Sequence, residues 1–170
     1  MERTGAFDFL GPRTLVGPEL KPGDKAPAFT LISNKLQEVS SDSFAGKPMI
    51  ISVVPSVDTS VCSVQTHRFD QEASKLGDAI NVIGVSVDLP FAQARWCGAE
   101  DISNMQVLSD YRDVSFGDAY GTHIKDLRLE SRAVFVVDAG GVIRYAEYVP
   151  VAGEHPDYDA VLTAVKGLLS

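Results

Sequence analysis

Cysteine is the residue type in this chain best suited to covalent chemistry, and the chain has two, Cys62 and Cys97. A cysteine thiolate is a nucleophile, and its sulfur can be oxidised and reduced again. The two residues are 35 positions apart, which excludes the Cys-x-x-Cys redox motif. Cysteine is also a common small core residue, so the surroundings of each thiol decide between a chemical and a structural role.

Cys62 follows a strand and a short connection. The run Met49–Val54 is short, apolar and rich in β-branched residues, and Pro55 ends it, which predicts a buried strand. A helix is expected from about Ser60 to Leu76, stopped by Gly77.

The start of this helix favours a charged sulfur. Thr59 or Ser60 can accept the first free N–H groups as the N-cap. With Thr59 as the cap, Cys62 lies in the first turn, where unpaired N–H groups and the helix dipole favour a thiolate. The apolar residues on the same helical face as Cys62 are Phe69, Ala73 and Leu76. The thiol therefore points inward, a position that by itself favours a core residue over a nucleophile.

The spacing of three residues changes this balance. Pro55, Thr59 and Cys62 form Pro-x-x-x-Thr-x-x-Cys, which resembles the peroxidatic motif of the peroxiredoxins. The fuller string from Pro55 to Cys62 is similar to the thiol peroxidase branch of the atypical two-cysteine peroxiredoxins. Two further segments resemble the same branch, Asp88–Glu100 and Ser131–Asp138. The resemblance extends from about residue 6 to the C-terminus.

The resemblance implies a role for each site residue. Cys62 would be the peroxidatic nucleophile, oxidised by a hydroperoxide to a sulfenic acid. Arg132 and Thr59 would hydrogen-bond the thiolate and the peroxide oxygens, and Pro55 would shield the sulfur from water. Cys97 would resolve the sulfenic acid as an intramolecular disulfide, which thioredoxin would reduce. The family also implies a homodimer, and no residue pattern indicates a cofactor.

Each of these residues has a structural alternative. Thr59 could act only as an N-cap, Arg132 as a charge at a strand edge, and Cys97 as a free structural thiol in a short helix. Without the resemblance, a redox enzyme and a structural α/β domain with incidental cysteines fit equally well. With it, we predict a thiol-dependent peroxidase acting on hydrogen peroxide and organic hydroperoxides. A non-enzymatic redox sensor, which passes a disulfide to a partner protein, is the alternative with the same site.

The order of apolar segments predicts an α/β fold. Buried strands alternate with helices, and a hairpin and a final helix follow, which indicates a mixed central sheet with helices on both faces. This order fits a thioredoxin-like fold of one domain over residues 1–170, with an N-terminal β-hairpin at about residues 6–17. Strands are expected at Phe7–Leu10, Arg13–Val16, Phe29–Ile32, Leu36–Val39, Met49–Val54, Ile80–Val87, Met105–Leu108, Ala133–Val137 and Val142–Tyr148. Helices are expected at Ser60–Leu76, Phe91–Gly98 and Val114–Tyr120, and from Pro156 onward.

Composition and charge exclude several other classes. The net charge of −8 argues against a nucleic-acid partner, which usually meets a basic patch. No apolar run is long enough for a membrane helix, and the N-terminus lacks the apolar core of a signal peptide. We therefore expect a cytoplasmic protein, where cysteines seldom form structural disulfides. His67, His123 and His155 show no metal-ligand spacing, and no metal site is predicted.

Overall fold

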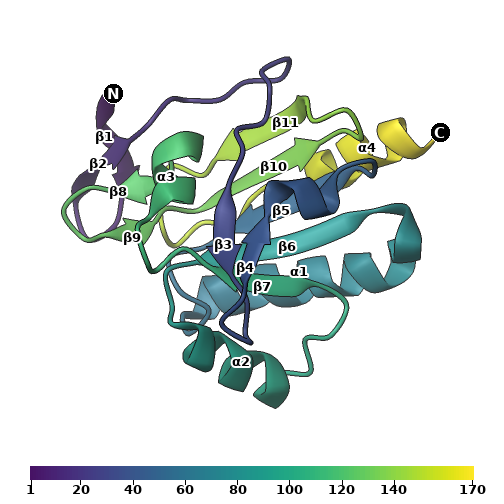
Figure 1. Ribbon diagram of the computed structural model, residues 1–170. Coiled ribbons are helices and arrows are strands. Elements are labelled where there is room, and N and C mark those ends of the chain that lie inside the picture. Colours follow the sequence, from purple (N-terminus) through teal and green to yellow (C-terminus); the bar gives the residue numbers. More distant parts are fainter.

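Seven strands form the sheet around which the chain is folded (Figure 1). The computed structural model describes residues 1–170. In chain order the strands are β3 (Thr30–Ile32), β4 (Glu38–Ser40), β5 (Met49–Val53), β6 (Asn81–Ser86), β7 (Gln106–Ser109), β10 (Ala133–Val137) and β11 (Ile143–Tyr148). Their order across the sheet is β11–β10–β5–β6–β7–β3–β4. The central strands β5, β6 and β7 are parallel, and all other pairs are antiparallel. The predicted mixed sheet is confirmed.

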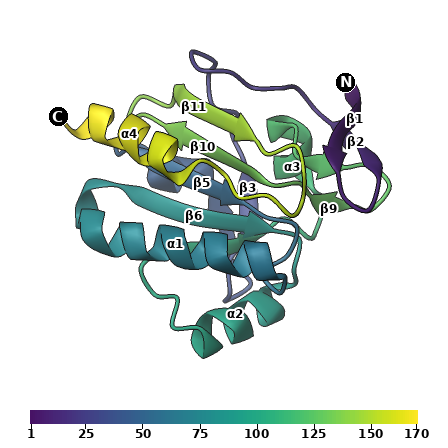
Figure 2. The same ribbon diagram turned by 180° about the vertical axis from the view of Figure 1, so that it is seen from behind.

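Helices cover both faces of this sheet. One face carries α1 (Ser60–Leu76) and α4 (Tyr158–Leu169), with α2 (Pro90–Ala99) beside α1 (Figure 2). The other face carries α3 (Ser115–Tyr120) and the 3-10 turn η1 (Ser41–Phe44) (Figure 1). A hydrophobic cluster fills each side. Because both faces of β5 and β10 are covered, every residue of these strands is buried.

A second, small sheet lies at the N-terminal side of the molecule. It consists of β1 (Glu2–Asp8), β2 (Pro12–Val16), β8 (His123–Ile124) and β9 (Leu129–Glu130), paired in that order. Its buried residues Phe7, Leu15 and Ile124 form a separate cluster. The predicted N-terminal hairpin is therefore confirmed, and the fold is thioredoxin-like. The single domain over residues 1–170 stays a prediction.

Several element boundaries differ from the sequence prediction, most of them by one or two residues. The first strand begins at Glu2 and ends at Asp8, because Leu10 adopts a positive φ of 56° in the hairpin turn. The last helix begins at Tyr158 rather than Pro156, since the Asp157 side chain accepts a hydrogen bond from the Ala160 N–H and caps it. Strands β8 and β9 were not predicted. Two residues are too few for a sequence pattern, and the two strands exist through pairing.

No helix of the protein is both long enough and apolar enough to cross a membrane.

Candidate active site

Pairing between β5 and β10 brings Arg132 to the helix that carries Cys62. The two strands are antiparallel, with Ala133 opposite Val53. Arg132 immediately precedes β10, so it lies at the end of β5 from which the chain continues through Pro55 into α1. The sheet thereby joins two residues that are 70 positions apart.

Cys62 lies in the first turn of α1 with its side chain directed into the protein. The residue is 0% exposed, and Arg132 Nη2 donates a hydrogen bond to its Sγ at 3.4 Å. One turn later, Thr66 Oγ1 donates to the Cys62 carbonyl oxygen at 2.9 Å. Cys62 points inward because it lies on the buried face of α1, and there its sulfur contacts the Arg132 guanidinium.

Arg132 is almost fully buried, with 2% of its surface exposed, and it has no carboxylate partner. Its Nε and Nη2 donate to the Ala152 carbonyl at 3.1 and 2.7 Å, and its Nη1 donates to Gln65 Oε1 at 3.0 Å. It takes part in none of the salt bridges of the protein. A buried charge is costly without a counter-ion. A negative charge that develops at the Cys62 sulfur during a reaction would supply one.

Gln65 is a site residue that the sequence analysis missed. Its Oε1 accepts from Arg132, and its Nε2 donates to Ser52 Oγ at 2.8 Å, so the amide connects the guanidinium to β5. Gln65 is 0% exposed. The sequence did contain a sign of its role: Gln65 lies three residues after Cys62, which puts a polar side chain on the buried face of α1.

The N-terminal hairpin supports the other side of Arg132. The Ala152 carbonyl accepts two bonds from the guanidinium, and the Ala152 N–H donates to the Asp8 carbonyl at 2.9 Å. The Asp8 N–H in turn donates to the Pro150 carbonyl at 2.8 Å. The last residue of β1 therefore holds the loop whose carbonyl orients Arg132. These are backbone bonds, which no side-chain motif reveals.

Pro55 and Thr59 lie in the connection between β5 and α1. Pro55 is buried, whereas Thr59 is exposed. Thr59 occupies the N-cap position with an extended backbone, but its side chain makes no capping hydrogen bond. The expectation that a Thr59 or Ser60 hydroxyl caps α1 is therefore wrong for this structure. The Thr59 hydroxyl has no partner in the protein, which leaves it free for other bonding.

Cys97 lies in the last turns of α2, in a different environment. Both cysteines are free thiols, and Cys97 is partly buried against the cluster between α1 and the sheet. Burial raises the pKa of the Cys97 thiol to about 11, and the negative charge of Asp70 adds to the shift. The thiol borders a cavity of about 360 Å³ that includes Ile102 and Met105. This raised pKa favours the neutral thiol at neutral pH.

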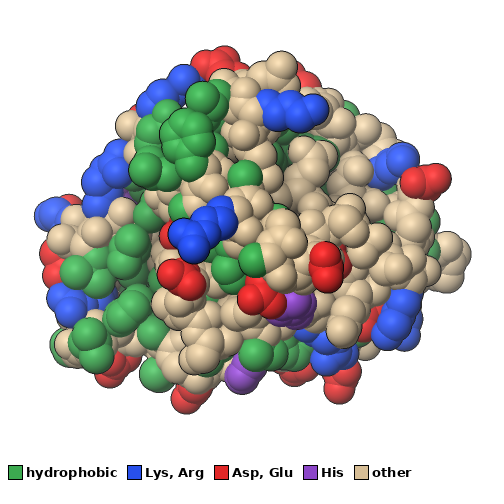
Figure 3. Space-filling view, turned by 90° about the horizontal axis from the view of Figure 1, so that it is seen from below, with side chains coloured by type: hydrophobic (Ala, Val, Ile, Leu, Met, Phe, Trp, Pro, Cys, Tyr) green, Lys and Arg blue, Asp and Glu red, His purple; other side chains and the backbone are tan.

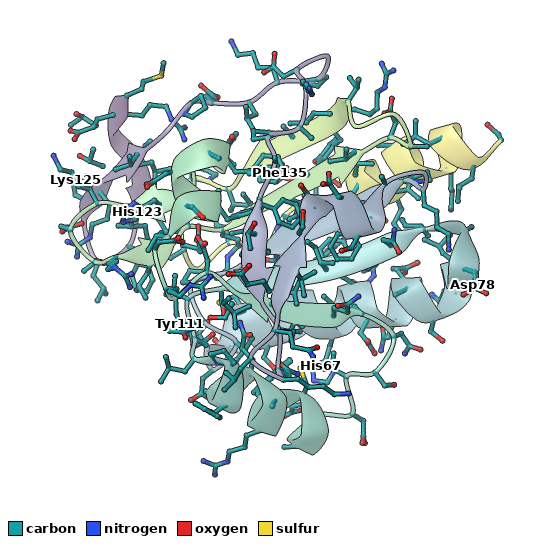
Figure 4. All side chains as sticks on the ribbon, viewed as in Figure 1. His67, Asp78, Tyr111, His123, Lys125 and Phe135 are labelled. Atoms are coloured by element: carbon teal, nitrogen blue, oxygen red, sulfur yellow. The ribbon has the colours of Figure 1, made fainter.

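Contacts between side chains connect α2 and the segment after it to α1. His67 Nε2 lies 3.0 Å from Glu100 Oε2, and its ring meets the Trp96 indole edge-on at 5.7 Å between centroids. Figure 4 shows His67 directly beside α2. Asp70 accepts two bonds from Asn104, one from the backbone and one from the side chain. Seen from below, the surface mixes hydrophobic, acidic, basic and histidine side chains (Figure 3). The His67 and Glu100 side chains are 38% and 44% exposed, so this pair is partly solvated and weak on its own.

The remaining histidines have structural partners. His123 Nδ1 lies 2.7 Å from Asp118 Oδ1, and His155 Nδ1 lies 2.9 Å from the Tyr158 hydroxyl. No group of three or more His, Cys, Asp or Glu side chains is arranged to hold a metal ion.

Comparison with known proteins gives one consistent result. Residues 21–162 match the Redoxin family. The chain is 56% identical over 159 residues to a thiol peroxidase of Bacillus subtilis strain 168, covering 94% of this chain and 95% of the relative. It is 55% identical over 155 residues to a thiol peroxidase of Listeria monocytogenes serotype 4b, covering 91% and 93%. A crystal structure of a peroxiredoxin-like protein from Aquifex aeolicus superposes with a TM-score of 0.87 at 40% identity, covering 93% of each chain. The chain therefore belongs to the Redoxin family, as a member of its thiol peroxidase branch of peroxiredoxins.

Proposed function

We propose that this protein reduces hydrogen peroxide and organic hydroperoxides with Cys62 as the attacking thiolate and Cys97 as the resolving thiol. Thioredoxin then reduces the resulting disulfide. The proposed chemistry needs no metal or organic cofactor, because sulfur carries the electrons. The family membership supports the peroxidase class, and the site residues support the assignment of the steps.

In the first step, the Cys62 thiolate attacks the terminal oxygen of the hydroperoxide. A sulfur–oxygen bond forms, the oxygen–oxygen bond breaks, and the leaving oxygen takes a proton to become water or an alcohol. Cys62 is left as a sulfenic acid. Arg132 stabilises the thiolate before attack and the negative charge on the leaving oxygen during it. In this proposal the Thr59 hydroxyl donates to the same oxygens, which its lack of a capping bond supports, and Pro55 limits access of water.

In the second step, the Cys97 sulfur attacks the sulfur of the Cys62 sulfenic acid. The disulfide forms as the sulfur–oxygen bond breaks, and hydroxide leaves with the Cys97 proton as water. A dithiol such as thioredoxin then reduces the disulfide by thiol exchange and becomes oxidised itself.

The observation that carries the proposal is the buried Arg132 guanidinium, which has no carboxylate partner and lies 3.4 Å from Cys62 Sγ. A structural cysteine in a core needs no such neighbour. A thiolate nucleophile needs a nearby positive charge before the attack, and the negative oxygen that leaves the peroxide needs the same charge during it.

The decisive test is a coupled assay with thioredoxin, thioredoxin reductase and NADPH, combined with mass spectrometry of the oxidised protein. We expect many NADPH turnovers per protein chain and a Cys62–Cys97 disulfide. The Cys97→Ser variant should consume one equivalent of peroxide, leave a sulfenic acid on Cys62, and then stop. A single transfer of one disulfide to a partner, without turnover, would favour the redox sensor instead.

We also propose that the protein works in the cytoplasm, where a thiol reductant is present, and that it forms a homodimer as the family implies. Size-exclusion chromatography with light scattering tests the second part. A monomer at micromolar concentration in both redox states would contradict it.

A further inference from the structure

One carboxylate connects the loop before Cys62 to the entrance of the helix that carries Cys97. Asp88 Oδ1 accepts a hydrogen bond from Ser56 Oγ at 2.7 Å, and Asp88 Oδ2 accepts from the Val57 N–H at 2.9 Å. Val57 is 2% exposed, so its N–H has no access to water as an alternative partner. Ser56 Oγ also accepts from the Asp58 N–H at 3.2 Å, which continues the bonded turn toward α1. Asp88 thus fixes the middle of the Pro55–Thr59 connection.

The other side of Asp88 is bonded to the sheet and to α2. Ser86 Oγ, at the end of β6, donates to Asp88 Oδ2 at 2.5 Å, and Ser109 Oγ, at the end of β7, donates to the Asp88 carbonyl at 2.5 Å. Gln93 Nε2 in α2 donates to Ser86 Oγ at 3.0 Å. Ser86, Gln93 and Ser109 are each 0% exposed. Hydrogen bonds from buried side chains therefore hold Asp88, and the ends of the central strands β6 and β7 set its position.

The two steps of the proposed reaction place opposite demands on the Pro55–Thr59 connection. The Pro55–Thr59 connection positions the first turn of α1, so that Cys62 contacts Arg132. Its middle is bonded to the rest of the protein through Asp88. Attack on peroxide uses the closed arrangement, in which the sulfur contacts the guanidinium. We expect disulfide formation to need the opposite, an opening of the first turn of α1 or of the segment around Cys97 that lets the Cα atoms come within disulfide range.

We propose that Asp88 is a positioning residue for the peroxidase reaction, which holds the Pro55–Thr59 connection closed over Cys62 until the sulfur is oxidised. This inference rests on the proposed function. Its consequence is an asymmetry between the two steps. Loosening the Asp88 bonds slows oxidation of Cys62 and leaves disulfide formation unchanged or faster. If Asp88 only stabilised the fold, its replacement would lower Cys62 oxidation and disulfide formation equally, by the fraction of the protein that is inactive.

The test is the Asp88→Asn variant, compared with the wild type and with Asp58→Asn. Asparagine keeps the shape but places an NH₂ group where the carboxylate accepts from Val57 or Ser86. Asp58 is an exposed acid of the same loop whose side chain makes no hydrogen bond, so its variant removes the same charge without the same contacts. Rapid-quench alkylation and mass spectrometry would follow reduced Cys62, sulfenic acid and disulfide separately after mixing with hydrogen peroxide.

We expect Asp88→Asn to slow the oxidation of Cys62 about tenfold or more, since bonds to a charged acceptor are lost. Disulfide formation should not be slower, and Asp58→Asn should match the wild type. Equal rates in Asp88→Asn and wild type, or an equal loss in both steps, would overturn the inference. If Asp88→Asn does not fold, Ser56→Ala replaces it, because this variant removes one of the same hydrogen bonds. We expect its oxidation of Cys62 to be several-fold slower, and an unchanged rate would contradict the inference. A wild-type protein that does not consume peroxide would instead contradict the proposed function.

Discussion

The environments of the two cysteines are opposites. Cys62 is 0% exposed, lies in the first turn of a 17-residue helix and contacts an unpaired guanidinium. Cys97 is partly exposed, lies near the end of a 10-residue helix and has the carboxylate of Asp70 nearby. A positively charged group contacts the Cys62 sulfur, whereas burial, with a smaller effect of the Asp70 carboxylate, raises the pKa of Cys97 to about 11. A neutral thiol is therefore favoured at Cys97.

This difference separates the two thiols in reactivity before any peroxide arrives. Because a neutral thiol reacts slowly with peroxide, we expect Cys97 to be spared in the proposed reaction while Cys62 is oxidised. The helices differ in a second way. The start of α1 is fixed by contacts at the buried ends of strands, whereas the end of α2 is held by partly solvated pairs such as His67 with Glu100. We therefore predict that the segment around Cys97 opens at lower cost than the first turn of α1.

Replacing the nucleophile should have the largest effect. Cys62→Ser should abolish peroxide consumption, because a serine hydroxyl is not ionised near neutral pH and is a poor nucleophile. Cys97→Ser is the matched control and should still consume one equivalent. Peroxide consumption by intact Cys62→Ser, measured with a ferrous-iron colour assay, would reverse the proposed roles.

Replacing the cation should have the next largest effect. Arg132→Lys keeps a positive charge but loses the planar set of donors that reaches Ala152, Gln65 and Cys62 together. We expect the second-order rate with hydrogen peroxide to fall by about 10²–10³. Less thiolate absorbance at 240 nm should accompany it at neutral pH. The control is Arg68→Lys, a partly exposed arginine of α1, the helix that carries Cys62. An equal loss of rate in both variants would contradict a specific role for Arg132.

Weakening the negative surroundings of Cys97 should have a moderate effect. Because the pKa of Cys97 is raised to about 11, its thiolate fraction grows as the pH rises, so disulfide formation should accelerate up to about pH 11. Asp70→Asn removes the smaller of the two causes of that shift and leaves burial, the larger, in place. The pKa of Cys97 should fall, and disulfide formation at pH 8 should become roughly two- to fivefold faster.

Rapid-quench kinetics against pH would measure this change. Asp78→Asn is the control, since Asp78 is an exposed acid (Figure 4) whose loss changes the net charge equally. An identical pH profile for Asp70→Asn and wild type would show that Asp70 does not act on Cys97.

The smallest expected signal reports the opening of α2. Trp96 precedes Cys97 and contacts the His67 ring, so its fluorescence should change in intensity or wavelength when one equivalent of peroxide forms the disulfide. Hydrogen exchange should become faster across residues 91–104. Thioredoxin should reverse both changes, and Cys97→Ser should show little of either. Equal spectra and equal protection in the two redox states would place the opening elsewhere, in the first turn of α1.

Much of the local structure was predictable because it depends on neighbouring residues. The helix bounds at Ser60 and Leu76 matched the structure, since an apolar face and a terminal Gly77 define them locally. The strands at residues 49–53 and 133–137 were equally clear from their β-branched runs. The prediction failed where pairing decides, as in the two-residue strand His123–Ile124. It also failed at the N-cap, where residue type permits a hydroxyl bond that the Thr59 side chain does not make.

The sequence by itself predicted Cys62 as the nucleophile, because its helix-start position and its resemblance to the peroxidatic motif involve only residues 55–62. The sequence also named Arg132, but only through resemblance to a family. The tertiary structure alone decided that the guanidinium meets the sulfur, since antiparallel pairing of β10 with β5 closes a gap of 70 positions. It likewise decided the supports of that contact, Gln65, the Ala152 carbonyl and the bonds of Asp88. These depend on burial and on long-range register, which no local pattern encodes.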